Sequence, residues 1–265
     1  MLNYENLVQQ AKLRELPLNK IRTILREYLQ ILTLKILNNN HHNELYFTGG
    51  TFLRLVFQNK RFSEDLDFYY HQMNRDRFEN LMEKTAIELK RYGFNTEVNY
   101  THWDNNFVGK LIFKEIENKY GVVSEYSKKS GIMIKIEASK YYERAECKSH
   151  IISGFGEIFP CLCADKSVLF SDKIDAIRKK NRGRDIYDLI FCLVNKFIPD
   201  KDVLSILDIK NEPLEFILES ISKIPSEQLS RQAKILQPFL FDESEIKLIE
   251  NAHTVILELI ENYQR

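Results

Sequence analysis

No run of apolar residues in this sequence approaches the roughly 18 that a membrane-spanning helix needs. Its first residues, MLNYENLVQQAKLRE, lack the charged leader and apolar core that are typical of a signal peptide. Only four cysteines occur, and their spacing matches neither a metal finger nor a disulfide scaffold. We therefore expect a protein of the reducing cytoplasm that has no membrane partner.

The chain also lacks an excess of charge of either sign, because 38 basic residues balance 38 acidic ones. Such a balance gives no global attraction to nucleic acid or to an anionic membrane. Any contact with nucleic acid would have to depend on a local basic patch. With 29% charged and 44% hydrophobic residues, the 265-residue chain has the composition of an ordinary globular protein of one or two domains.

Apolar residues recur at three- and four-residue steps in residues 2–39 and again from Ser171 onward, which predicts helices in both regions. Pro17 divides the first region, and later prolines divide the second. Between these regions, strands are predicted at residues 45–48, 62–70, 95–103, 107–115 and 132–139, and helices at 52–57 and 75–92. We predict an α+β fold in which residues 1–165 form N-terminal helices and a core with a mixed sheet, and residues 166–265 form a C-terminal helical bundle.

The most informative segment is YFTGGTFLRLVFQNKRFSEDLDFYY, residues 46–70. Gly49 and Gly50 follow a predicted strand and open a predicted helix, where backbone N–H groups can approach a phosphate closely. Thr51 would either cap that helix or hydrogen-bond a phosphate oxygen. Taken alone, the triplet is more often a tight turn before a capped helix, so the phosphate interpretation depends on the acids that follow.

Asp65 and Asp67 fall in the strand predicted for residues 62–70, where side chains two residues apart point to the same face. The two carboxylates would project together, roughly 7 Å apart along the strand. Such a pair favours a bound cation, and Mg²⁺ fits because it takes oxygen ligands and leaves positions for phosphate oxygens. On its own, D-x-D more often marks an exposed strand face. The 13 residues between Thr51 and Asp65 allow one short helix and a return to the same end of the sheet.

A third acid is expected on a neighbouring strand, and Glu137 in the alternating segment IMIKIEAS is the best candidate. Lys135 would share its face, opposite the isoleucines of the segment. A solvent-facing strand that carries a lysine and a glutamate explains the same pattern.

Taken in order, G-G-T, R-F-S-E-D-L-D-F and a strand with a third acid resemble the polymerase-β-type nucleotidyltransferase fold. The motif GGTFLRL…KRFSEDLDF is similar to a motif of the AbiEii/AbiGii nucleotidyltransferase toxins of bacterial toxin–antitoxin and phage-defence systems. SDKIDAIRKKNRGRDIYDL, residues 171–189, resembles the second signature of that family, a helix with Lys, Ala and Arg followed by R-D-x-x-D-L. Glu137 departs from the pattern, because polymerase-like enzymes usually have Asp as the third acid.

The resemblance implies that Asp65 and Asp67 bind divalent ions, Mg²⁺ or Mn²⁺. Glu137 would bind one ion and lie near the acceptor hydroxyl, as a general base or as the group that orients it. The residues that the resemblance places on the nucleoside triphosphate are Gly49, Gly50, Thr51, Ser63 and Lys173. Ser63 would otherwise only bridge to the next strand.

Lys173 would neutralise the triphosphate, and Asp185 corresponds to the essential acid of the second signature. Asp185 would orient Lys173 or an arginine, and Asp188 one turn later could serve instead. From the residues alone, Lys173 would be a solvated lysine and Asp185 an acid at a helix start. Arg54 also fits the first signature, or it lies on the surface of its helix.

The implied reaction transfers a nucleotide from an NTP to RNA, with the acceptor end (3′ end) of tRNA as the expected acceptor, and releases pyrophosphate. The implied role is that of a toxin restrained by a cognate antitoxin. The basic run at residues 178–184 would receive an RNA backbone, or it is a solvated turn between helices. Transfer to a protein or a small molecule remains an alternative, as does a non-catalytic nucleotide-binding module.

We predict no metal site at two further pairs of residues, one of histidines and one of cysteines. His41-His42 lies in a polar linker without a third ligand in view, and Cys161-x-Cys163 alternates as buried thiols on a strand would.

Overall fold

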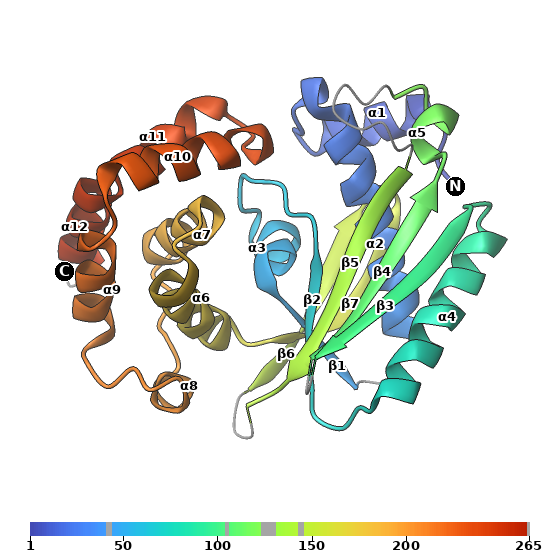
Figure 1. Ribbon diagram of the computed structural model, residues 1–265. Helices are drawn as coiled ribbons and strands as arrows, with labels where there is room; N and C mark the ends of the chain where they lie inside the picture. The colour runs from blue at the N-terminus through green and yellow to red at the C-terminus, as the bar shows by residue number, and fades with distance from the viewer. Residues whose placement is uncertain (41–43, 104–105, 123–130, 143–145, 264–265) are drawn as a thin grey trace. The chain divides into compact units, whose positions relative to one another are not determined.

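The computed structural model describes residues 1–40, 44–103, 106–122, 131–142 and 146–263 (Figure 1). The pair His41-His42 lies outside these residues. The chain forms two compact units. The sheet unit comprises Met1–Gln58, Phe62–Tyr141 and Cys147–Cys163, and the helical unit comprises Asn59–Arg61, Tyr142–Glu146 and Ala164–Arg265. The segment Asn59–Arg61, only a few residues before Asp65, therefore packs with the helices.

Within the described residues, the sheet unit contains one mixed sheet of seven strands in the order β3-β4-β5-β2-β1-β7-β6. The strands are β1 (Leu45–Thr48), β2 (Leu66–Tyr70), β3 (Thr96–Trp103), β4 (Asn106–Lys114), β5 (Gly131–Lys140), β6 (Cys147–Gly154) and β7 (Glu157–Ala164). β2 is antiparallel to β1 and parallel to β5, while β3, β4 and β5 form an antiparallel meander. The predicted α+β fold with a mixed sheet is confirmed.

One face of this sheet is apolar, and helices cover it. Its central row is Phe47, Phe68, Ala138 and Phe107. Phe52 from α3 (Gly49–Phe57) packs on Phe47 with ring centroids 5.9 Å apart. Phe78 from α4 (Arg75–Arg91) packs on Phe107 at 5.6 Å. The opposite face is thereby left to the polar residues that alternate with this row.

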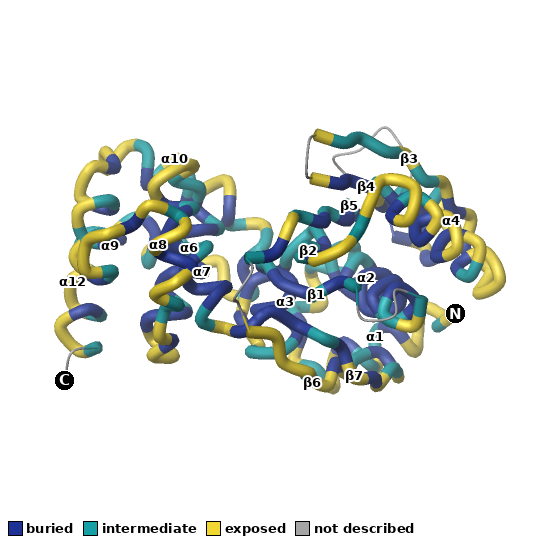
Figure 2. Tube along the Cα trace, turned by 90° about the horizontal axis from the view of Figure 1, so that it is seen from below, coloured by how far each residue is buried: buried dark blue, intermediate teal, exposed yellow. Residues whose placement is uncertain are grey.

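The N-terminal helices are α1 (Tyr4–Leu13) and α2 (Ile21–Asn40), with Pro17 between them as predicted. Figure 2 shows that α2 is buried along most of its length. It even buries Glu27, whose Oε2 accepts a hydrogen bond from Nε of Arg54 at 2.9 Å. The alternative that placed Arg54 on a helix surface is therefore wrong. A short helix, α5 (Ile116–Lys119), completes the helices of this unit in the described part of the chain.

The helical unit contains α6 (Lys166–Lys180), α7 (Gly183–Val194), α8 (Lys201–Ile206), α9 (Pro213–Ser222), α10 (Ser226–Leu236), α11 (Ile246–Glu250) and α12 (Ala252–Tyr263). Pro213 is the first residue of α9 and Pro225 precedes α10, so these prolines lie where a helix can begin. No helix among the described residues is long and apolar enough to cross a membrane.

Candidate active site

The predicted glycine turn is present. β1 ends at Thr48, and α3 begins at once with Gly49 and Gly50. Gly49 has φ of +80°, and a Cβ atom added to it would lie 2.1 Å from Oδ2 of Asp67. Because only glycine lacks that atom and adopts this φ without strain, the turn can lie directly against the carboxylate. The glycines and one acid thus meet at one end of adjacent strands, as the spacing predicts.

Thr51 does not cap α3, because Thr48 occupies the N-cap position. The expectation of a Thr51 cap is wrong. Thr51 is the third residue of the helix, is buried, and donates its hydroxyl hydrogen to the backbone carbonyl of Asp65. The same loop is held one step earlier, where the Ser63 carbonyl accepts from Nε2 of Gln30 at 3.1 Å. Both bonds fix the chain that carries the acids.

Asp65 precedes the strand rather than lying within it, since β2 begins at Leu66. The prediction that residues 62–70 form one strand is wrong for its first four residues. Their backbone is held by Thr51 and Gln30 instead of a strand neighbour. Asp67, the second residue of β2, pairs in register with Thr48 on β1 and with Glu137 on β5. The predicted neighbouring strand with a third acid is therefore adjacent to Asp67.

Lys135 lies among these acids. Its Nζ is 2.8 Å from Oε1 of Glu137 and 3.5 Å from Oδ2 of Asp65. Burial alone would lower the pKa of Lys135, but the hydrogen bond to Glu137 and the charges of both carboxylates raise it above its ordinary value. The lysine is therefore a permanent positive charge beside Asp65, Asp67 and Glu137, which we call the acidic cluster.

The chemistry of this cluster fits a hard cation. Within the described residues, no three His, Cys, Asp or Glu side chains are grouped closely enough to hold a metal ion. Asp65 and Asp67 still offer the oxygen ligands that Mg²⁺ prefers, and Mg²⁺ usually takes only one or two protein carboxylates beside substrate phosphates. The position of Gly49 against Asp67 would let such phosphates approach the same carboxylate.

The second predicted group lies in the helical unit, and it is buried. Nζ of Lys173, on α6, is 2.8 Å from Oδ2 of Asp188 and 3.9 Å from Oδ1 of Asp185, both on α7. Burial alone would lower the pKa of Lys173, but the two carboxylates raise it. Asp185 also accepts from Nε of Arg182 at 2.6 Å. Lys173 is therefore an ion-paired buried lysine and not the solvated one that its residue type alone suggests.

Asp188 is the centre of this group, because three side chains converge on it. Arg61 donates to both of its oxygens, from Nε at 2.7 Å and from Nη2 at 2.6 Å, and Nδ2 of Asn59 donates at 3.0 Å. Burial alone would raise the pKa of Asp188, but Arg61 and Lys173 hold it at about 2. No role for Arg61 or Asn59 was predicted from the sequence, although Arg61 lies within the signature K-R-F-S.

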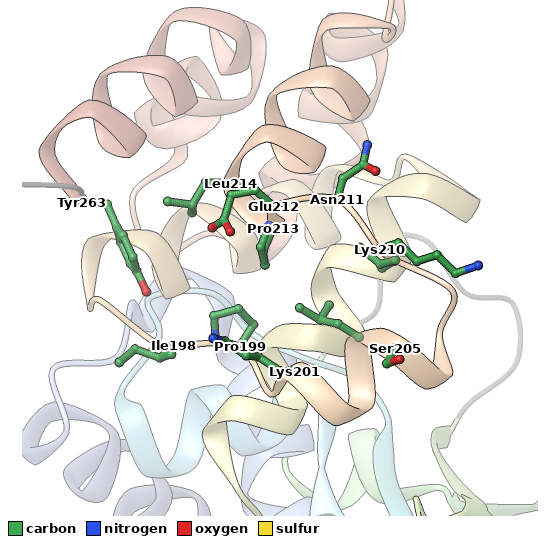
Figure 3. Close-up of a pocket in the computed structure, with 12 residues that line it drawn as sticks. Ile198, Pro199, Lys201, Ser205, Lys210, Asn211, Glu212, Pro213, Leu214 and Tyr263 are labelled. Carbon is green, nitrogen blue, oxygen red and sulfur yellow. The ribbon is translucent and has the colours of Figure 1, made fainter.

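A separate cavity of about 670 Å³ lies in the helical unit, between α8, the start of α9 and the end of α12 (Figure 3). Ile198, Pro199, Leu204, Ile209, Leu214 and Tyr263 contribute to its lining. None of the residues predicted for the site lines it. Lys201, Ser205, Lys210 and Glu212 also contribute to its lining.

The fold and the order of the two motifs define the class of protein as a nucleotidyltransferase. The chain belongs to the AbiEii family, described as nucleotidyl transferase AbiEii toxin of type IV toxin–antitoxin systems, whose family model matches residues 30–245. No curated relative matches the chain.

Solved structures with the same fold include JHP933 from Helicobacter pylori, with a TM-score of 0.59 and 17% identity over 92% of this chain and 94% of that one. MenT4, a nucleotidyltransferase toxin from Mycobacterium tuberculosis, has a TM-score of 0.52 and 15% identity over 99% of each chain. At such identities these likenesses show the fold alone.

Proposed function

We propose that this protein is a Mg²⁺-dependent toxin that transfers a nucleotide from an NTP to RNA, with the 3′ end of tRNA as the expected acceptor, and releases pyrophosphate. The observation that carries the proposal is the Asp67 carboxylate, which lies against Gly49 and beside the strand of Glu137. This arrangement supports a site where phosphate and cation are bound together. Membership in the AbiEii family supports the reaction class.

The residues of the sheet unit would act on the α-phosphate. Asp65 and Asp67 would hold Mg²⁺ or Mn²⁺. When bound, the cation would neutralise phosphate charge and favour departure of pyrophosphate. The backbone N–H groups of Gly49 and Gly50, at the start of α3, would donate to the phosphates, which the helix N-terminus also attracts. Thr51 supports this arrangement through its hydrogen bond to the Asp65 carbonyl.

Glu137 would accept the proton of the acceptor hydroxyl or orient that hydroxyl. Its position next to Asp67 supports this role, because the hydroxyl must attack the phosphate bound there. Ser63, in the loop before Asp65, would donate to a phosphate oxygen through its side chain.

Lys173 would neutralise the triphosphate, and its two carboxylate partners would position it. Of these, Asp188 is the stronger candidate for the positioning acid, since its Oδ2 is 2.8 Å from the ammonium whereas Oδ1 of Asp185 is 3.9 Å away. The division of the chain at residue 165 into a nucleotidyltransferase domain and a helical domain belongs to the same proposal.

The basic run at residues 178–184 gives limited support to an RNA acceptor. Arg178 and Lys179 both pair with Asp175, and Arg182 pairs with Asp185. Much of the positive charge is thus compensated within the helical unit. The proposed RNA acceptor, the restraint by an antitoxin and the role in phage defence rest on the family instead.

The test uses purified protein, MgCl₂, total bacterial RNA and each α-labelled nucleotide in turn. Asp65→Asn/Asp67→Asn is the inactive control, and Glu97→Gln on the exposed edge of β3 is the matched charge control. Label in a tRNA-sized band with the wild type and with Glu97→Gln only would support the proposal and identify the donor. Label on protein would move the acceptor to a polypeptide. Nucleotide binding without any label would favour the non-catalytic module.

A further inference from the structure

Lys135 is a charged residue of the acidic cluster to which the proposed reaction gives no role. It lies two residues before Glu137 on β5, so both side chains project from the same face of the sheet. Its ammonium contacts Glu137 and also Asp65, which lies on the chain segment before β2. The Lys135 side chain is only 27% exposed. The lysine therefore links two acids that come from different segments of the sheet unit.

The ammonium of Lys135 and a divalent cation would compete for the same carboxylate oxygens of this site. Both bind carboxylate oxygens, and each repels the other at short range. A cation that takes Oδ2 of Asp65 must displace Nζ of Lys135 or share the oxygen with it. A displaced, partly buried ammonium loses its hydrogen bonds, and this loss opposes binding of the cation.

We propose that Lys135 is an internal counter-ion of the acidic cluster, which competes with divalent cations for Asp65 and Glu137 and keeps the affinity of the nucleotide-free protein for such cations low. This inference rests on the proposed function, because it takes the cluster as the cation site. Its consequence is that the cation binds well only with a nucleotide, whose phosphates accept the displaced ammonium.

The experiment titrates MnCl₂ into nucleotide-free protein by calorimetry and compares the wild type with Lys135→Met, Lys135→Arg and Lys110→Met. Lys110 is the register partner of Lys135 on β4, so its replacement removes the same charge one strand away. We expect Lys135→Met to bind Mn²⁺ about tenfold more tightly than the wild type, because a nearby positive charge is gone. Lys135→Arg and Lys110→Met should stay within about twofold of the wild type.

Melting temperatures provide a second readout, and they also report whether each variant folds. In EDTA, Lys135→Met should melt below the wild type, since its carboxylates then repel one another, and MnCl₂ should raise its melting temperature more than that of the wild type. Equal Mn²⁺ affinity for Lys135→Met and the wild type would overturn the inference, even if nucleotide transfer is observed. Tighter Mn²⁺ binding by Lys135→Met without any transfer by the wild type would instead refute the proposed function alone.

Discussion

Gly49 and Asp67 lie so close that any side chain at position 49 would collide with the Asp67 carboxylate: a Cβ on Gly49 would be 2.1 Å from Oδ2 of Asp67. The contact joins the first residue of α3 to the second residue of β2, which are separated by a helix and a loop in the chain. It therefore couples the proposed phosphate-binding turn to the proposed metal ligand.

Gly49→Ala should abolish nucleotide transfer and destabilise the sheet unit. The new Cβ would both occupy a strained φ of +80° and collide with the carboxylate. Gly93→Ala is the matched control, because Gly93 has a φ of +88° and nothing within 4 Å of its Cβ position. The control should lose about 1 kcal/mol of unfolding free energy and keep its activity. Urea denaturation measures the stability of both variants, and label transfer measures their activity. An equal loss of activity in both variants would contradict a specific role for the contact.

Asp67→Asn should reduce transfer at least about 100-fold while the fold is retained, because the amide keeps the size of the side chain and removes the charge that would bind the cation. Single-turnover label transfer at saturating Mg²⁺ measures the effect. A variant with more than a tenth of the wild-type rate would remove Asp67 from the list of metal ligands. Circular dichroism melting of the same sample shows whether the loss reflects chemistry or unfolding.

The local pattern of the sequence predicted the strand–glycine–helix turn at 45–57 and the strand that carries Glu137, because both depend on neighbours in the chain. It misplaced Asp65, since the loop before β2 is held by Thr51 and Gln30, and these are long-range hydrogen bonds. No pattern of neighbouring residues in the sequence predicts these two hydrogen bonds.

Two other features also depend on contacts between distant segments. The burial of Lys173 follows from Asp188, whose charge is balanced in turn by Arg61 from 127 residues earlier. The turn between β6 and β7 uses Phe155 and Gly156, both with positive φ. Phe155 carries no turn signal but is buried, and its ring packs on Tyr28 at 5.6 Å. Tertiary packing outweighs local preference there.

Asp188→Asn should be among the most destabilising single changes in the helical unit. It would leave the Arg61 guanidinium and the Lys173 ammonium buried without their shared carboxylate, a situation that typically costs about 3–5 kcal/mol. Asp208→Asn is the matched control, because Asp208 pairs with Lys210 on the surface, where such pairs contribute about 0–1 kcal/mol. Urea denaturation at neutral pH measures both. A loss for Asp188→Asn no greater than that of the control would show that the buried cluster does not depend on this charge.

The lowered pKa of Asp188 predicts how the free energy of unfolding depends on pH. Burial opposes the charge of Asp188, but Arg61 and Lys173 lower its pKa from 3.8 to about 2. A carboxyl group whose pKa is lower in the folded state stabilises the protein above its unfolded pKa, and this contribution is lost as the pH falls through the folded pKa. The wild type should therefore lose about 2 kcal/mol more than Asp188→Asn between pH 5 and pH 2, in addition to losses that both share. Urea denaturation across that range, in a buffer in which both proteins are folded before urea is added, measures the difference. Parallel curves for the two proteins would mean that Asp188 titrates near its ordinary pKa, and that Arg61 and Lys173 do not hold its charge in place.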